Sequence, residues 1–212
     1  MKGWMKALLW TAGILGIVFG VLRIWFIEFQ RIPEDRNDLR NWANAPNLEP
    51  GDFVLVWRGS TPHVGDMVRC VDPDDPGRWM VARVVGIAGE KVEMVDGVVL
   101  INNFRTRINA CEGEPRKTMS PEGVEVDFTC NSEELGASRH DMYGPGSATQ
   151  MAPVVVEAGK VFLLSDNRQE AFAHDSRQVG SMPIEACSQR LAVRLWSKKG
   201  WSDSSRRMSF LF

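Results

Sequence analysis

The sequence has few of the residues that build metal sites and no excess of the charge that binds nucleic acid. None of its four cysteines forms a CxxC pair, and its three histidines lack the spacing of metal ligands. The 25 basic and 27 acidic side chains leave a net charge of -2, so no broad basic face is indicated. We therefore expect no metal site, no small-molecule cofactor and no nucleic-acid partner.

Four cysteines nevertheless favour an oxidising compartment. Cys111 and Cys130 bracket a polar stretch, and a disulfide between them would close a loop of about 20 residues. Cys70 and Cys187 remain as a second pair or as buried thiols. Four cysteines allow three pairings, and the sequence does not choose among them.

Long apolar runs are also scarce, because only one approaches the length of a membrane span. It covers residues 7–22, is broken by Arg23 and resumes over 24–27. We predict a single transmembrane anchor within residues 1–29. Lys2 and Lys6 favour a cytoplasmic N-terminus, with the rest outside the bacterial cytoplasmic membrane. Three basic residues beyond the run weaken that orientation: Arg31, Arg36 and Arg40.

A cleaved secretory signal is the competing interpretation. Residues 43–45 show its small-x-small pattern, but they lie about 15 residues beyond the apolar run, and the run is longer than a usual signal core. An uncleaved anchor is favoured. Ala12, Gly16 and Gly20 share one face of that helix and would let a partner helix approach, although glycine is common in membrane helices.

The rest of the chain has the short apolar runs and turn signals of a β protein. Residues 30–42 are polar and suggest a juxtamembrane linker. The β core is expected over 43–102 and 153–212, with a hairpin at Asp96-Gly97 and one strand-like stretch over 154–164. Residues 103–152 show little periodicity and are predicted to form an inserted subdomain or long loop.

Several segments resemble the sequence boxes of the bacterial type I signal peptidases, which are Ser/Lys proteases. Residues 44–52, NAPNLEPGD, resemble the nucleophile box Ser-Met-x-Pro-Thr-Leu-x-x-Gly-Asp, and the register places Ala43 where the serine stands. Residues 81–90, VARVVGIAGE, resemble the lysine box, with Ala82 at the general-base position.

Further boxes follow in the family's order behind the anchor. They are Gly65-Asp66, the Asp96-Gly97 turn, the Ser165-Asp166-Asn167-Arg168 stretch, and Asp175-Ser176-Arg177 followed by Gly180. The resemblance covers most of the chain. It implies a mainly β fold, a signal-peptidase-like core of coiled antiparallel sheets, carrying an insert and preceded by one transmembrane helix.

Alanine at 43 and 82 provides neither a nucleophile nor a base. A serine hydroxyl needs a neighbouring base to take its proton, and a lysine serves only when its surroundings favour the neutral amine. We therefore predict that the chain is not an enzyme. Neighbouring positions also differ from the family pattern: Asn41, Trp42, Asn44, Asn47 and Ser165. This spread argues against an engineered inactive variant.

Other hydroxyls near a histidine are weaker candidates. Ser60 and His63 fall in a predicted turn, which favours a loop serine and a solvated imidazole. A catalytic triad is suggested by the residue types at His174, Asp175 and Ser176. The family resemblance, however, implies a structural role for the Asp-Ser-Arg segment.

The resemblance assigns two groups of residues. Those expected to line a remaining cleft, or to contact a partner, are Asn41, Trp42, Asn44, Pro46, Leu48, Met80 and Val81. Those expected to support the site structurally are Arg83, Asp166, Asn167, Arg168, Asp175 and Arg177.

Two functions follow from different classes. The favoured hypothesis is a membrane-anchored pseudoenzyme that binds protein as a subunit, chaperone or assembly factor of a cell-envelope complex. The alternative is an active endopeptidase that removes leader peptides with non-standard catalytic residues.

Overall fold

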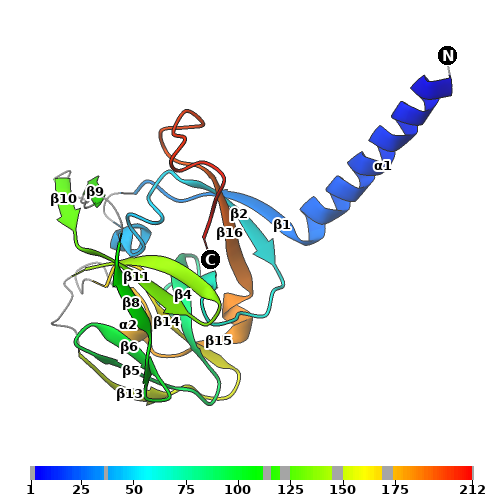
Figure 1. Ribbon diagram of the computed structural model, residues 1–212. Helices are drawn as coiled ribbons and strands as arrows, with labels where there is room; N and C mark the ends of the chain where they lie inside the picture. The colour runs from blue at the N-terminus through cyan, green and yellow to red at the C-terminus, as the bar shows by residue number, and fades with distance from the viewer. Residues whose placement is uncertain are drawn as a thin grey trace.

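The structure is a computed structural model, and it describes residues 3–35, 38–111, 116–119, 125–144, 150–168 and 174–211. One apolar helix, α1 (Gly3–Trp25), projects from a curled β domain (Figure 1). None of its residues is buried, and its most apolar 18-residue window has a mean hydropathy of 2.0. At 1.5 Å per residue, 23 residues extend about 35 Å, which is enough to cross a hydrocarbon core of about 30 Å.

The β domain begins almost at once after the helix, with β1 (Ile27–Arg31). The joint is tied on both sides: the Arg23 guanidinium donates to the Ile27 carbonyl over 2.9 Å, and the Arg58 amide donates to the Phe26 carbonyl over 2.8 Å. The rings of Phe26 and Trp57 stack with centroids 5.8 Å apart. Residues 27–29 were predicted to be the end of the anchor, and 30–31 the start of a linker. In the structure they form the edge strand β1, because their backbone groups pair with those of β2.

The principal sheet has eight strands, in the order β1-β2-β16-β3-β4-β14-β15, with β17 paired to β16. All of its strand pairs are antiparallel. Its remaining strands are β2 (Phe53–Arg58), β3 (Met67–Val71), β4 (Trp79–Ile87), β14 (Lys160–Leu164), β15 (Met182–Pro183), β16 (Gln189–Trp196) and β17 (Ser209–Phe210).

Among the described residues, three short helical segments lie in the connections of this sheet. The 3-10 helix η1 (Leu39–Trp42) contacts β4, and η3 (Ile184–Cys187) contacts β3. The single-turn helix α2 (Ser176–Val179) packs on β14, and the Asp175 carboxylate caps its first turn. Apolar side chains of β3, β4 and β14 meet those of η3 in one core cluster.

A four-stranded sheet of order β13-β5-β6-β7 covers the second core cluster. The predicted hairpin is present, with Asp96 and Gly97 at φ of 53° and 74° between β5 (Lys91–Val95) and β6 (Val98–Ile101). The stretch 154–164 is not one strand. It divides into the end of β13 (Met151–Val155) and β14, because the chain turns where Lys160 N bonds to Glu157 O and Gly159 takes a φ of 75°.

The described part of the region predicted to form an inserted subdomain or long loop, 103–152, contains strands. A three-stranded sheet joins β8 (Arg107–Ala110), β11 (Cys130–Leu135) and β12 (Ser138–Tyr143), and β9 (Arg116–Met119) pairs with β10 (Glu125–Phe128). β7 (Phe104–Arg105) belongs to the four-stranded sheet. Strands β11 and β12 lack apolar alternation because Glu133 and His140 point into the protein, where they meet other polar groups.

Candidate active site

The segment that follows η1 is docked between β4 and the loop after β14. Ala43 and Asn44 are buried there. The Asn44 amide donates to the Val81 carbonyl over 2.5 Å, and its Oδ1 accepts the Asp166 backbone N–H over 3.0 Å. The Asn167 N–H donates to the Ala43 carbonyl, also over 3.0 Å. These bonds bring together the segments that resemble the nucleophile box, the lysine box and the Asp-Asn-Arg stretch.

Ala82 lies on β4, where it pairs with Val68 of β3 and is fully buried. Its neighbours in the same core cluster include Met80 and the two half-cystines Cys70 and Cys187. Like Ala43, it presents a methyl group that neither attacks a carbonyl nor accepts a proton. Ser/Lys chemistry therefore has no functional group at these two positions.

A cavity of about 270 Å³ opens beside the docked segment. Four of the residues expected at a cleft line it: Asn41, Asn44, Leu48 and Val81. The others take different places. Met80 packs in the core beside Ala82, whereas Trp42 and Pro46 are not among the lining residues. The Trp42 indole N–H is buried and has no hydrogen-bond acceptor within the part of the chain that the structure describes.

The lining of this cavity includes both apolar and charged residues. Ile32, Leu48 and Val81 are among the apolar ones, and Asp38 and Arg40 are among the charged ones. The cavity can therefore bury a small apolar side chain and offer hydrogen bonds to an extended backbone.

Asp38 binds the two arginines that line the cavity, Arg40 and Arg78. It accepts the Arg40 backbone N–H over 3.2 Å, the Arg40 Nε over 2.9 Å, and Arg78 Nη1 over 2.9 Å. Arg40 reaches on to Asp72, whose Oδ2 lies 2.9 Å from His174 Nε2. Burial alone would raise the pKa of Asp72, but the hydrogen bonds from Arg40, the Asp74 backbone and His174 hold it below its usual value.

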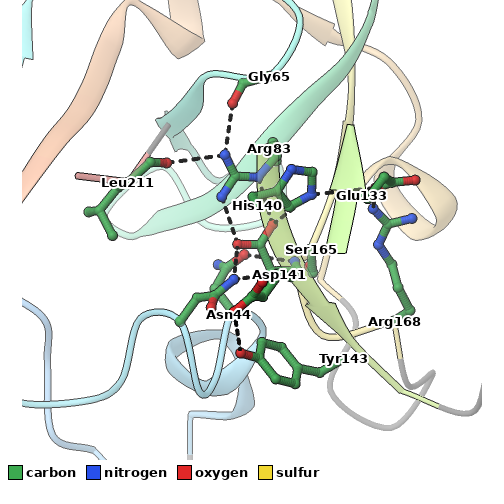
Figure 2. Close-up of polar contacts among 12 residues, drawn as sticks. Asn44, Gly65, Arg83, Glu133, His140, Asp141, Tyr143, Ser165, Arg168 and Leu211 are labelled. Carbon is green, nitrogen blue, oxygen red and sulfur yellow. Dashed lines mark hydrogen bonds and ion pairs between the residues drawn. The ribbon is translucent and has the colours of Figure 1, made fainter. Parts of the chain in front are cut away.

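Behind the site lies a buried ion pair between Arg83 and Asp166. Arg83 Nε and Nη2 each donate to one Asp166 oxygen over 2.8 Å, and Nη1 donates to the carbonyls of Gly65 and Leu211 (Figure 2). Burial raises the pKa of Asp166, but Arg83 more than offsets this and brings it to about 2. The carboxylate therefore stays ionised and holds β4 to the loop after β14.

A second buried ion pair, which the sequence analysis did not predict, continues this network. Glu133 of β11 lies 2.5 Å from Arg168 Nη2, and His140 Nε2 of β12 lies 3.4 Å from Glu133 and 3.8 Å from Asp166 (Figure 2). Arg168 outweighs the effect of burial and lowers the pKa of Glu133 to about 2. The sequence signal for this buried pair was limited to polar residues, such as Glu133 and His140, within the weakly periodic segment 103–152. Strands that face solvent produce the same pattern, so the signal did not indicate burial.

The apparent triad at 174–176 is not assembled. The Asp175 carboxylate binds the Arg177 guanidinium at 2.9 and 2.7 Å and accepts the Ser165 N–H at 2.8 Å. The Ser176 hydroxyl accepts the Leu163 N–H at 2.9 Å, while His174 turns to Asp72. These groups join β14 to α2 and are not arranged for nucleophilic attack.

The second hydroxyl–histidine candidate is not assembled either. The Ser60 Oγ is buried and has no hydrogen-bond partner among the residues described, and the His63 side chain is exposed, with its Nδ1 3.6 Å from Asp66.

All four cysteines are paired. Cys70 joins Cys187, which links β3 to η3, and Cys111 joins Cys130, which spans the segment between β8 and β11. On α1, a Cβ built at Gly16 or Gly20 meets no atom within 4 Å, so the small-residue face that includes Ala12 is open.

The family model described as "Signal peptidase, peptidase S26" matches residues 2–196 of this chain. The chain belongs to this signal peptidase family. Curated proteins named "Signal peptidase I" are similar to it. That of Rickettsia bellii strain OSU 85-389 is 29% identical over 169 residues, which cover 72% of this chain and 56% of the relative. That of Rickettsia felis is 28% identical over 148 residues, covering 63% and 53%.

The chain thus spans about half the length of the curated relatives it matches. Among solved structures, a signal peptidase I from Enterococcus faecalis V583 aligns with a TM-score of 0.37 and 21% identity. The alignment covers 61% of this chain and 96% of that one.

These comparisons correct the prediction that the chain is not an enzyme. That prediction relied on Ala43 and Ala82, and it is overturned because the matched family is a peptidase family and the curated relatives are named "Signal peptidase I". Alanine at these positions excludes a serine nucleophile and a lysine base there. It does not exclude hydrolysis by other groups, so the step from two missing side chains to inactivity was wrong.

Proposed function

We propose that this protein is a membrane-anchored endopeptidase of the signal peptidase type, acting on a membrane-proximal segment of exported proteins. The observation that carries the proposal is the family match over residues 2–196, which includes α1, the docked segment and β4. The cavity beside that segment supports it, because its lining includes Asn44 and Val81, the chain neighbours of the predicted nucleophile and base positions Ala43 and Ala82.

The substrate would lie extended, with a small side chain against Leu48 and Val81. Signal sequences are cleaved after small residues in an Ala-x-Ala-like pattern, which suits a cavity of about 270 Å³ whose lining includes apolar side chains. Asn41 and Asn44, also in the lining, would contact the peptide backbone.

Hydrolysis in this cleft needs an attacking group other than residues 43 and 82. We assign that role to water, with Asp35 and Asp38, the carboxylates that line the cavity, as the groups that accept its proton. The water oxygen would add to the scissile carbonyl, and the accepted proton would pass to the leaving amine. Arg40 and Arg78, which also line the cavity, would offset the negative charge of the tetrahedral intermediate.

The proposed location is the outer side of a bacterial cytoplasmic membrane, with the N-terminus inside. Lys2 and Lys6 before the apolar run support this orientation. The two disulfides support an oxidising compartment for the β domain.

A second candidate function is stable binding of an envelope protein in the same cleft, as a chaperone, assembly factor or subunit of a complex. The observation that favours it is the pair of buried methyl groups at Ala43 and Ala82, which keeps the cleft while supplying no Ser/Lys pair. The open Ala12/Gly16/Gly20 face would then serve a partner helix.

One experiment separates the two functions. Full-length protein in detergent is incubated with a peptide that carries an apolar leader and an Ala-x-Ala junction, and both binding and cleavage are followed by fluorescence and mass spectrometry. Endopeptidase function predicts cleavage at the junction, lost in Asp38→Asn and retained in the control Asp203→Asn. Tight binding without cleavage supports the second candidate, and neither binding nor cleavage contradicts both.

A further inference from the structure

Trp79, the first residue of β4, is a large aromatic side chain at the cavity beside the docked segment. It lines that cavity, and 42% of its surface is exposed. Tryptophan is highly buried on average, so an exposed indole that lines a cavity is informative. Val81, two residues along β4, lines the same cavity. Alternate residues of a strand point to the same face, so Trp79 extends the apolar lining about 7 Å beyond Val81.

The indole ring of Trp79 is held in place by Arg69 of β3. The Arg69 guanidinium carbon lies 4.3 Å from the centroid of the ring, which is the geometry of a cation–π contact. Only 4% of Arg69 is exposed. Because this guanidinium covers one face of the ring, the exposed surface of Trp79 belongs to the opposite face and to the ring edge.

Arg69 is in turn fixed by three polar side chains from two other strands. Its Nε donates to Gln189 Oε1 of β16 over 2.6 Å, and Nη1 and Nη2 each donate to one Glu28 carboxylate oxygen of β1 over 3.1 Å. Nη1 also donates to Gln30 of β1, which lines the cavity as Trp79 does. In the sheet, β2, β16 and β3 separate β1 from β4. Arg69 therefore links lining residues from two distant strands and fixes them before any ligand binds.

We propose that Trp79 forms a subsite for a large aromatic or apolar side chain of the peptide that occupies this cavity. The inference rests on the proposed function, in which a small side chain of an extended peptide lies against Leu48 and Val81. Side chains of an extended chain that point the same way are about 7 Å apart, which matches the spacing from Val81 to Trp79. The next peptide side chain on the same face, on the side away from Ala82, would therefore lie over the indole.

The position of Arg69 decides which side chain this subsite favours. An aromatic ring stacks on an indole face, and a preorganised tryptophan loses little entropy when the ligand binds. A bare indole face would also attract a lysine or arginine. Here Arg69 already occupies the opposite face of the ring, so repulsion between like charges offsets that attraction. The subsite should therefore prefer phenylalanine to leucine, and both of these to lysine.

The test uses the full-length protein in detergent and fluorescently labelled leader peptides that carry an Ala-x-Ala junction. A single phenylalanine, leucine, lysine or alanine is placed two residues before the first alanine of the junction. A second series places it two residues after the last alanine, so that both directions of the peptide are covered. Binding is measured by fluorescence anisotropy, and cleavage of the same peptides by mass spectrometry. In one series we expect phenylalanine to bind about tenfold more tightly than alanine, and lysine no more tightly than alanine.

Variants assign this gain to the indole. Trp79→Ala should remove the gain from phenylalanine and change the affinity for the alanine peptide less than twofold, whereas Trp79→Phe should keep most of the gain. The control is Trp201→Ala, which removes an indole that is 56% exposed and lies outside the cavity lining. This control should leave the gain intact. Melting temperatures check that each variant is folded.

Equal affinities for the phenylalanine and alanine peptides in both series would overturn the subsite, as would a gain that survives in Trp79→Ala. Failure of the endopeptidase proposal is a different outcome. Binding that depends on phenylalanine, without cleavage, would support the subsite and contradict the endopeptidase. Cleavage with no dependence on the tested residue would overturn the subsite and leave the endopeptidase standing.

Discussion

The carboxylate of Asp166 faces the guanidinium of Arg83 through two parallel N–H···O contacts of 2.8 Å each, and both side chains are almost completely buried. The pair joins residues 83 positions apart in the chain. It also fixes the loop whose backbone holds Asn44 and Ala43.

Removing the charge of Asp166 should therefore be costly. Asp166→Asn leaves the Arg83 charge buried without a counter-ion, and we expect the free energy of unfolding to fall by about 3–5 kcal/mol. Urea unfolding followed by tryptophan fluorescence measures it. The control is Glu134→Gln, which breaks an exposed pair with Arg107 and should change stability by less than about 0.5 kcal/mol. Equal effects in the two variants would contradict the structural role of the buried pair.

Stability should fall in two steps as the pH is lowered. His140 has a lowered pKa in the folded protein, so the unfolded chain binds the extra proton and stability begins to fall as the pH drops below about 6.5. Glu133 and Asp166 have folded pKa values of about 2, against 4.5 and 3.8 in model compounds. Their contribution is complete above pH 4.5 and is lost as the pH falls toward 2.

Melting temperatures recorded across pH 2–8 measure both steps. His140→Gln should remove the upper step and leave the lower one. A profile that stays flat from pH 5 to 2 would show that these carboxylates are not held as the structure describes.

Two glycines with similar backbone angles should respond differently to alanine. Gly65 has a φ of 96°, and a Cβ there would lie 2.5 Å from the Ser138 Cβ and 2.9 Å from the Leu135 carbonyl. Gly89 has a φ of 86° with open space around it. Both variants suffer backbone strain of about 1–2 kcal/mol, but only Gly65→Ala adds a clash costing about 1–3 kcal/mol more. Thermal unfolding of the two variants compares them, and equal losses would contradict the close packing of β12 on the turn before β3.

The two disulfides should contribute unequally to stability. Cys70 and Cys187 are 117 residues apart, and Cys111 and Cys130 are 19 apart. In the chain-entropy model the longer loop contributes about 4.7 kcal/mol and the shorter about 3 kcal/mol. Paired Cys→Ser variants should therefore rank in that order by thermal unfolding. The reverse order would mean that the disulfides do not stabilise the protein mainly by restricting the unfolded chain.

Restoring the family's serine at position 43 and its lysine at position 82 tests whether these two positions were assigned correctly. Ala82→Lys puts an amine in an apolar cluster, where burial favours the neutral form that a base requires, at an overpacking cost of about 1–3 kcal/mol. Ala43→Ser with Ala82→Lys should cleave a leader peptide faster than the unmodified protein, while Ala43→Ser alone should not. A double variant that folds but shows no gain would mean that the positions do not face each other.

Much of the β core could be predicted because its strands carry apolar runs that end at glycine turns. Phe53–Arg58 and Trp79–Ile87 are examples, and Asp96-Gly97 marked its hairpin. The strands around Glu133 and His140 could not be predicted. The inward-facing residues of these strands are polar. Burial of Glu133 becomes favourable only because Arg168, from another part of the chain, pairs with it.

The candidate site shows the same limit. Matching boxes located Ala43, Ala82, Arg83 and Asp166 along the chain, but they did not predict the ion pair between Arg83 and Asp166. Periodicity likewise could not reveal that Met80 faces the core while Val81 faces the cavity. Neighbouring residues on one strand point to opposite faces, so the choice depends on which side the docked segment covers.

The joint between α1 and β1 has a consequence for how the bilayer acts on this protein. Because β1 starts two residues after the helix ends and the Arg23 and Arg58 contacts fasten the corner, there is no flexible tether (Figure 1). A helix accommodates a thinner membrane by tilting. Any such tilt of α1 would rotate the whole β domain with it. The thickness of the bilayer would therefore determine how far the cleft lies from the lipid surface and in which direction it opens.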